Sequence, residues 1–164
     1  MKRFRVATAL ALFLISGLAL AESGGKKTFE TLKSLDGTWE GKSGRGEPLT
    51  VTFRETAGGS ALLSEIHGMG KENMVSMIHL DGDRILLTHY CGAGNQPRMQ
   101  GTIAADGKSV AFDFVDATNL SSPDAPHMHH LVISMPDANH HTEQWTFLDH
   151  GKEMTETLSM QRSK

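Results

Sequence analysis

From residue 38 onward the sequence is a series of short strand-like runs separated by turn residues, and this pattern constrains the fold more than any other feature. Apolar and polar residues alternate within runs such as Leu49-Thr50-Val51-Thr52-Phe53, which is the period of a β-strand with one buried face. Turn pairs such as Asp81-Gly82 and Asp106-Gly107 leave mostly short connections, which favour antiparallel hairpins. The predicted strands are Thr38–Gly44, Leu49–Thr56, Ala61–His67, Asn73–Leu80, Arg84–Cys91, Arg98–Ala104, Ser109–Asp116, His127–Met135, His140–Leu148 and Glu153–Gln161.

About ten successive strands need an arrangement that leaves no long open edge. An up-and-down antiparallel barrel meets this need because the sheet closes on itself. We therefore predict an all-β barrel preceded by a short helix over Thr28–Leu35, where apolar residues recur every three positions. A β-sandwich is the alternative, but its Greek-key crossings need more long connections than Gly92–Pro97 and Ala117–Pro126.

The first 21 residues have the pattern of a secretory signal peptide. A basic start from Lys2 to Arg5 precedes an apolar run, and Ala19-Leu20-Ala21 supplies the small-x-small pattern that a signal peptidase recognises. We predict cleavage after Ala21, a flexible tether at 22–27 and a single domain at 28–164. The expected location is the periplasm, or the medium outside the cell.

The composition after the leader excludes several classes of partner. Thirteen basic and nineteen acidic residues remain, a formal net charge of −6, which disfavours nucleic acid and anionic lipid. The single cysteine, Cys91, excludes an internal disulfide framework. No later apolar stretch reaches the roughly 18 to 20 residues of a membrane helix, so no integral membrane segment is expected after cleavage. The oligomeric state is left open.

The segment Leu35-Asp36-Gly37-Thr38-Trp39-Glu40-Gly41, after a short helix, resembles the opening of calycin-type barrels. These are the lipocalins, the fatty-acid-binding proteins and the haem-binding nitrobindins, and the resemblance implies that Trp39 closes the barrel floor. Thr88-His89-Tyr90-Cys91 and Gly94-Asn95-Gln96-Pro97-Arg98-Met99 are similar to a bacterial exported family of unassigned function. In nitrobindins a His close to the C-terminus holds the haem. Because the predicted last strand here contains no His, the resemblance does not carry haem binding to this chain.

A ligand site is predicted at the Gly92–Pro97 connection, because binding residues favour long loops on a rigid scaffold. An imidazole, a phenol, two amides and a guanidinium lie close together next to an apolar strand. The guanidinium of Arg98 suits either a ligand carboxylate or an internal acid. Which strand face is inside the barrel is left open, since a shift of one residue inverts every assignment. The predicted ligand-binding residues are His89, Tyr90, Asn95, Gln96, Arg98 and Trp145.

The chain has nine His, all after the leader, and six of them fall between residues 127 and 150. His127, His129 and His130 form the candidate metal site, because alternation places the first two on one strand face. Nearby Met residues suit Cu(I). The alternative is a solvated, His-rich strand end. The cofactor is unknown, and a transition metal or haem is compatible with the His content.

No nucleophile, base and orienting group stand at a recognisable spacing, so no catalytic residue is predicted. The preferred function is binding of a small apolar or amphipathic ligand within the barrel. Three alternatives remain open. They are a His-rich metal- or haem-binding envelope protein, an enzyme using His89 and Cys91 or a metal, and an envelope protein whose barrel is filled by its own side chains.

Overall fold

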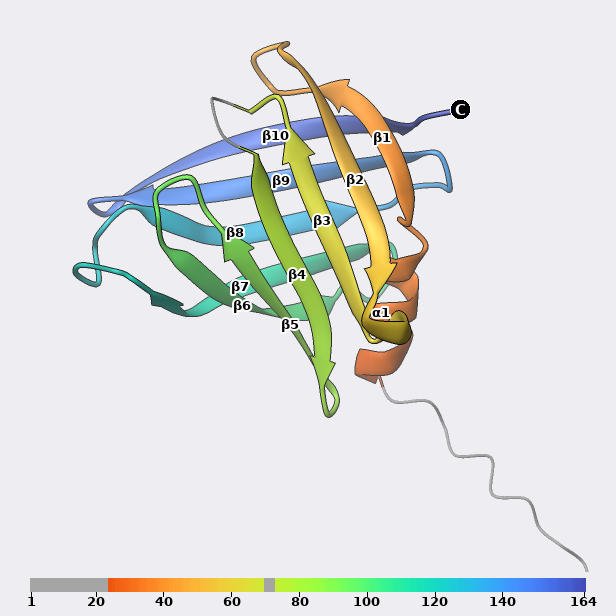
Figure 1. Ribbon diagram of the computed structural model, residues 1–164, viewed down its shortest axis with the longest axis horizontal. Coiled ribbons are helices and arrows are strands. Elements are labelled where there is room, and N and C mark those ends of the chain that lie inside the picture. Colours follow the sequence, from red (N-terminus) through yellow and green to blue (C-terminus); the bar gives the residue numbers. More distant parts are fainter. Residues whose placement is uncertain (1–23, 70–72) are drawn as a thin grey trace, which may run out of the picture.

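The structure is a computed structural model that describes residues 24–69 and 73–164, and the predicted signal peptide lies outside these ranges. Each of the ten predicted strands is present, and one short helix precedes them (Figure 1). The elements are α1 (Gly24–Lys33), β1 (Gly37–Lys42), β2 (Pro48–Thr56), a 3-10 turn (Ala57–Gly59), β3 (Ala61–His67), β4 (Met74–Asp81), β5 (Arg84–Tyr90), β6 (Gln96–Ile103), β7 (Ser109–Thr118), β8 (His127–Ser134), β9 (His140–Asp149) and β10 (Lys152–Arg162).

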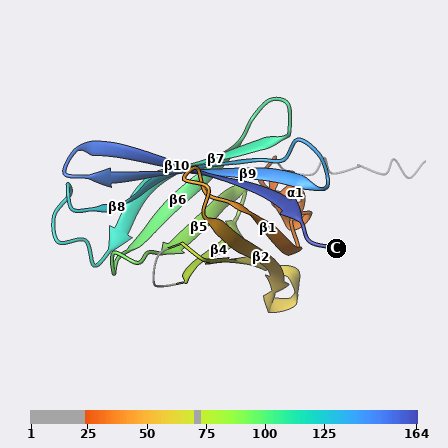
Figure 2. The same ribbon diagram turned by 90° about the horizontal axis from the view of Figure 1, so that it is seen from above.

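The strands form a closed antiparallel barrel in which each pairs with its neighbours in sequence. Strand β1 completes the ring by pairing with β10, from Trp39 opposite Arg162 to Lys42 opposite Ser159. Figure 2 shows these two strands side by side from a second direction. The predicted up-and-down barrel is therefore confirmed, and the β-sandwich alternative is wrong.

Strand alternation decides which residues enter the interior. In β2, Leu49, Val51 and Phe53 are buried, whereas the polar residues between them are half-buried. In β9, His141 and Glu143 are also buried and point to the same side as Trp145. The interior therefore combines an apolar core with a few enclosed polar side chains, and these set the chemistry of the site described below.

Helix α1 lies against one end of the barrel, at the lower right in Figure 1. It buries Phe29 and Leu32 in the core. The amide of Gly25 donates to Asp83 Oδ1 at 2.6 Å, which ties the first turn to the β4–β5 hairpin. The helix therefore begins four residues before the predicted Thr28, within the segment predicted as a tether. No helix in the described part of the chain is both long and apolar enough to span a membrane.

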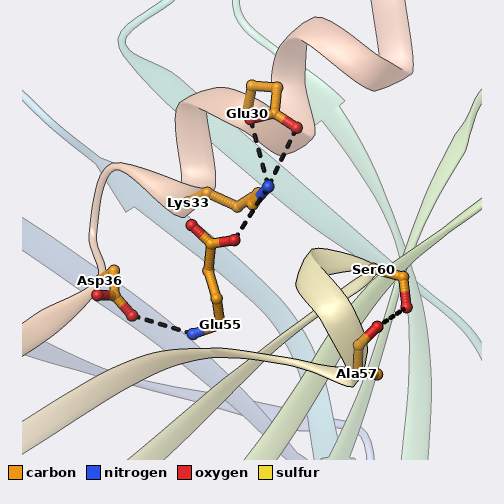
Figure 3. Close-up of polar contacts among 6 residues, drawn as sticks. All are labelled: Glu30, Lys33, Asp36, Glu55, Ala57 and Ser60. Carbon is orange, nitrogen blue, oxygen red and sulfur yellow. Dashed lines mark hydrogen bonds and ion pairs between the residues drawn. The ribbon is translucent and has the colours of Figure 1, made fainter.

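The last turn of α1 is held to the β2–β3 corner by charged groups (Figure 3). Lys33 Nζ lies 3.3 Å from Glu30 Oε1 and 3.1 Å from Glu55 Oε2. Asp36 Oδ1 accepts the backbone N–H of Glu55 at 3.0 Å. These contacts keep the helix across the barrel end, so this end is closed.

Trp39 packs beneath the helix and is almost fully buried. Its indole Nε1 donates to the carbonyl of Leu35 at 2.7 Å. The guanidinium of Arg162 lies 4.1 Å from the ring centre and donates to the carbonyls of Ser34 and Asp36, each at 2.7 Å. Residues from the two ends of the described chain thus meet at the closed end.

Candidate functional site

The end of the barrel opposite α1 carries a cleft of about 360 Å³. Its lining comes from the β1–β2 and β5–β6 connections, from Met69 after β3, and from β4, β8, β9 and β10. This open end is called the mouth of the barrel. The β1–β2 loop is at the top of Figure 1, and the blue β9–β10 turn is on the left. The cleft is at the lower end of the usual range for small-molecule sites. Its lining residues are Ser43, Arg45, Glu47, Met69, Met74, Cys91, Gly92, Ala93, Met128, Phe147 and Glu156.

The rim of the cleft is charged, whereas its wall is mainly apolar. Arg45 Nε lies 3.6 Å from Glu156 Oε2, and Glu156 Oε1 accepts the N–H of Gly44 at 2.7 Å. Below the rim, the lining contains three thioethers and the Phe147 ring. Such a site accepts an apolar body and leaves a polar end near the rim.

The β5–β6 connection gives the cleft one fixed side. Cys91 donates its N–H to the carbonyl of Asn95 at 3.2 Å, and its own carbonyl accepts the N–H of Gly94 at 3.0 Å. Gly94 has φ of +81°, a left-handed conformation that glycine adopts at low cost. Cys91 Sγ accepts the N–H of Ala93 at 3.5 Å. The thiol is half-buried and lines the cleft.

One layer below the cleft, His89 is fully enclosed in the barrel. Its Nδ1 lies 2.9 Å from Ser76 Oγ, and its ring centre is 4.7 Å from that of Trp145. Its Nε2 has no hydrogen-bond partner. Burial lowers the pKa of the imidazole from 6.5 to about 4, because the charged form would lose its hydration. His89 is therefore neutral at pH 7.

A buried polar chain continues toward the closed end. Trp145 Nε1 donates to Glu143 Oε2 at 2.9 Å, and His141 Nε2 lies 3.1 Å from Glu143 Oε1. The His141 ring meets the Trp39 ring edge-on, with centres 4.4 Å apart. Glu143 and Trp145 border an internal gap that is too small to hold a water molecule. This gap is therefore too small for haem, the group that nitrobindins hold, and β10 offers no His to bind it.

The structure separates the predicted ligand residues into two groups. His89 and Trp145 face the interior and contact each other. Asn95 is also buried, and its Nδ2 donates to the carbonyl of Pro126 at 2.8 Å. The side chains of Tyr90 and Arg98 are instead more than half exposed.

Arg98 and Gln96 have hydrogen-bond partners on β7 and directly after it. Arg98 donates through Nε and Nη2 to the two carboxylate oxygens of Asp116. This pair raises the pKa of the guanidinium. Gln96 Oε1 accepts from Thr118 Oγ1 at 2.5 Å and from Asn119 Nδ2 at 3.2 Å. Neither residue is among those that line the cleft.

The candidate metal-binding histidines lie at the end of β8 that is nearer the mouth. His127 pairs with Leu148, far from the Asp137 turn that joins β8 to β9, as the hairpin geometry predicts. His127 is buried, with Nδ1 2.7 Å from the carbonyl of Ala125 and Nε2 3.3 Å from His129 Nδ1. His130 faces Asp113 at 2.9 Å. Within 24–69 and 73–164, no three His, Cys, Asp or Glu side chains form a group that could hold a metal ion.

Sequence reasoning did not assign the thioethers of Met69, Met74 and Met128, or Phe147, to the ligand site. They come from four different segments, so no local motif joins them. Strand parity was the only usable signal, because Phe147 lies two residues after Trp145 on the same strand.

No family model and no curated protein matches this chain. The fold is similar to those of several solved structures, which include the following two. One is Rv2717c from M. tuberculosis, at 15% identity and a TM-score of 0.56, covering 84% of this chain and 98% of that one. The other is a protein of unknown function from the DUF3598 family of Nostoc punctiforme PCC 73102, at 15% identity and a TM-score of 0.57. It covers 80% of this chain, which spans only 48% of that protein. At this identity the likeness shows the fold alone.

Proposed function

We propose that this protein is an exported binding protein that holds a small apolar or amphipathic molecule in the open end of its barrel. The observation that carries the proposal is the cleft of about 360 Å³, with thioethers and an aromatic ring below a charged rim. Burial of the ligand's apolar surface would supply the affinity. The charged rim, with Arg45 and Glu156, would face the polar end of the ligand.

The closed end of the barrel supports a ligand site at the opposite, open end. Helix α1 and Trp39 fill one end of the barrel, and the side chains around Glu143 leave no room for a water molecule in the middle. A ligand of drug-like size therefore fits at the mouth and not in the interior. The export proposed here rests on the sequence pattern of residues 1–21.

The proposal is tested with 8-anilinonaphthalene-1-sulfonate, an amphipathic fluorescent probe, and the purified protein. We expect saturable binding of one probe per chain. Met128→Gln in the cleft should raise the Kd roughly tenfold, because it removes one buried apolar contact of about 1.5 kcal/mol. Met154→Gln, at an exposed site on β10, is the matched control and should leave the Kd unchanged.

Native mass spectrometry of protein recovered from its own envelope then identifies the natural occupant. Equal Kd values for both variants, or no saturable probe binding, would contradict a ligand site at the mouth and favour a barrel filled by its own side chains.

A further inference from the structure

The cleft concentrates sulfur. Three of the nine Met residues and the single Cys line it, although they are far apart in the sequence. Met74 lies at the start of β4, Cys91 directly after β5 and Met128 near the start of β8. Thioethers and thiolates are soft ligands that select soft metal ions such as Cu(I). The described residues offer no comparable cluster of three His, Cys, Asp or Glu side chains for a harder ion.

The strand register places a nitrogen donor beneath two of these sulfurs. Ser76 pairs with His89, and Val75 pairs with Tyr90. Continuing this register by one residue sets Met74 opposite Cys91, so the two form the next inward-facing pair toward the mouth. His89 Nδ1 is engaged by Ser76 Oγ, whereas Nε2 is buried without a partner. A buried nitrogen of this kind costs stability unless something binds it.

We propose that the open end binds a soft monovalent cation, Cu(I) in the cell, through the sulfurs of Cys91, Met74 and Met128 with His89 Nε2 as the nitrogen ligand. Met has three flexible torsions, so its sulfur can turn toward an ion without moving the backbone. On binding, the Cys91 thiol loses its proton to water and forms the S–Cu bond, and the metal keeps its oxidation state. This goes beyond the proposed function, because it uses sulfur lone pairs and not apolar area.

The test uses Ag(I), a soft monovalent ion that does not change oxidation state, added to the purified protein in chloride-free buffer. We expect one ion per chain by calorimetry. In methyl-labelled protein, the Met74 and Met128 methyl signals should shift, while that of Met77 should stay in place. Met77 is on the same strand as Met74 but alternates to its other face. Anaerobic competition against a chromogenic Cu(I) chelator then measures the affinity for Cu(I).

The variants separate metal binding from packing. Met74→Leu with Met128→Leu keeps the volume and apolar surface of the wall, and should raise the Kd for Ag(I) and Cu(I) at least tenfold. Cys91→Ser should do the same, and Met77→Leu should change nothing. The ¹⁵N signal of His89 Nε2 in the unmodified protein should also shift on binding. This readout remains informative if a His89 variant fails to fold.

Unchanged affinity in the double Leu variant would overturn the proposal, because Cys91 would then be reacting as an isolated thiol. Failure of the unmodified protein to bind one ion would overturn it as well. Binding of the fluorescent probe distinguishes a failure of this inference from a failure of the proposed ligand function. In the unmodified protein, probe binding without metal binding refutes only this inference, and metal binding without probe binding refutes only the proposed ligand function. In the double Leu variant, loss of metal binding with retained probe binding supports the inference, because Leu preserves the apolar wall.

Discussion

The enclosed imidazole of His89 links a single residue to the pH dependence of the whole fold. The unfolded residue has a pKa near 6.5, whereas burial lowers the folded value to about 4. Between these values the unfolded chain binds a proton that the folded chain does not. Stability is therefore complete above about pH 6.5 and falls as the pH drops toward 4, by roughly 3 kcal/mol for this group.

Urea unfolding of the metal-free protein between pH 7 and pH 4 measures this loss. His89→Gln should remove most of this residue's contribution to the pH dependence of the free energy of unfolding, whatever its effect on stability at pH 7. His79→Gln, on the half-buried outer side of β4, is the control and should keep this pH dependence. The same pH dependence of stability in the unmodified protein and in His89→Gln would show that this imidazole takes up no proton on unfolding.

The outward position of Arg98 shows where sequence reasoning stops at the residue scale. Alternation is local, so the buried face of Leu49, Val51 and Phe53 follows from the sequence. Arg98 also alternates with the buried Pro97 and Met99, but the polar sequence around it does not reveal which of the two faces is inside. Glu143 is equally difficult to place, because its burial depends on Trp145 and on His141 two positions away.

At the scale of elements, the position of α1 depends on one close approach. A Cβ added to Gly25 would lie 2.0 Å from the carbonyl oxygen of Asp83. Because this oxygen belongs to the backbone, it cannot move aside as the end of a flexible side chain can. Gly25→Ala should therefore lower the free energy of unfolding by roughly 1 to 3 kcal/mol. Chemical denaturation measures this, and faster amide exchange at Phe29 and Leu32 would locate the change in the helix.

Gly24→Ala is the matched control, since nothing lies within 4 Å of a Cβ there. It should be neutral or slightly stabilising, because Ala favours helix more than Gly does. Equal stability of the two variants would mean that the first turn of α1 does not rest on the β4–β5 hairpin. The sequence predicts this helix from its apolar spacing, but its earlier start depends on a hairpin some 58 positions away.

At the scale of the whole molecule, the barrel follows from the sequence more completely than the site does. Ten runs with short turns leave few alternatives to ring closure. The cleft instead gathers side chains from loops that are distant in the sequence. Their meeting depends on strand tilt and on the register between strands, which no local pattern encodes.

The proposed export of the molecule gives a direct prediction. Residues 1–21 lie outside the described structure, and their sequence predicts removal by a signal peptidase. Protein recovered from its native host should begin at Glu22, as measured by intact mass and N-terminal sequencing. Ala21→Leu should slow processing and leave the precursor in the membrane fraction. Recovery of the unmodified protein with the leader still attached would contradict the proposal.

The contact between Arg162 and Trp39 has a consequence in time. Strand β1 is among the first parts of the fold to be synthesised, yet one of its two partners is the last strand. The guanidinium that covers Trp39 belongs to the end of that same last strand. During synthesis, nine strands can therefore pair in order while the ring stays open. Until β10 has been synthesised, the earlier strands form an unclosed sheet with two unpaired edges, and the barrel becomes a container only when that strand is in place.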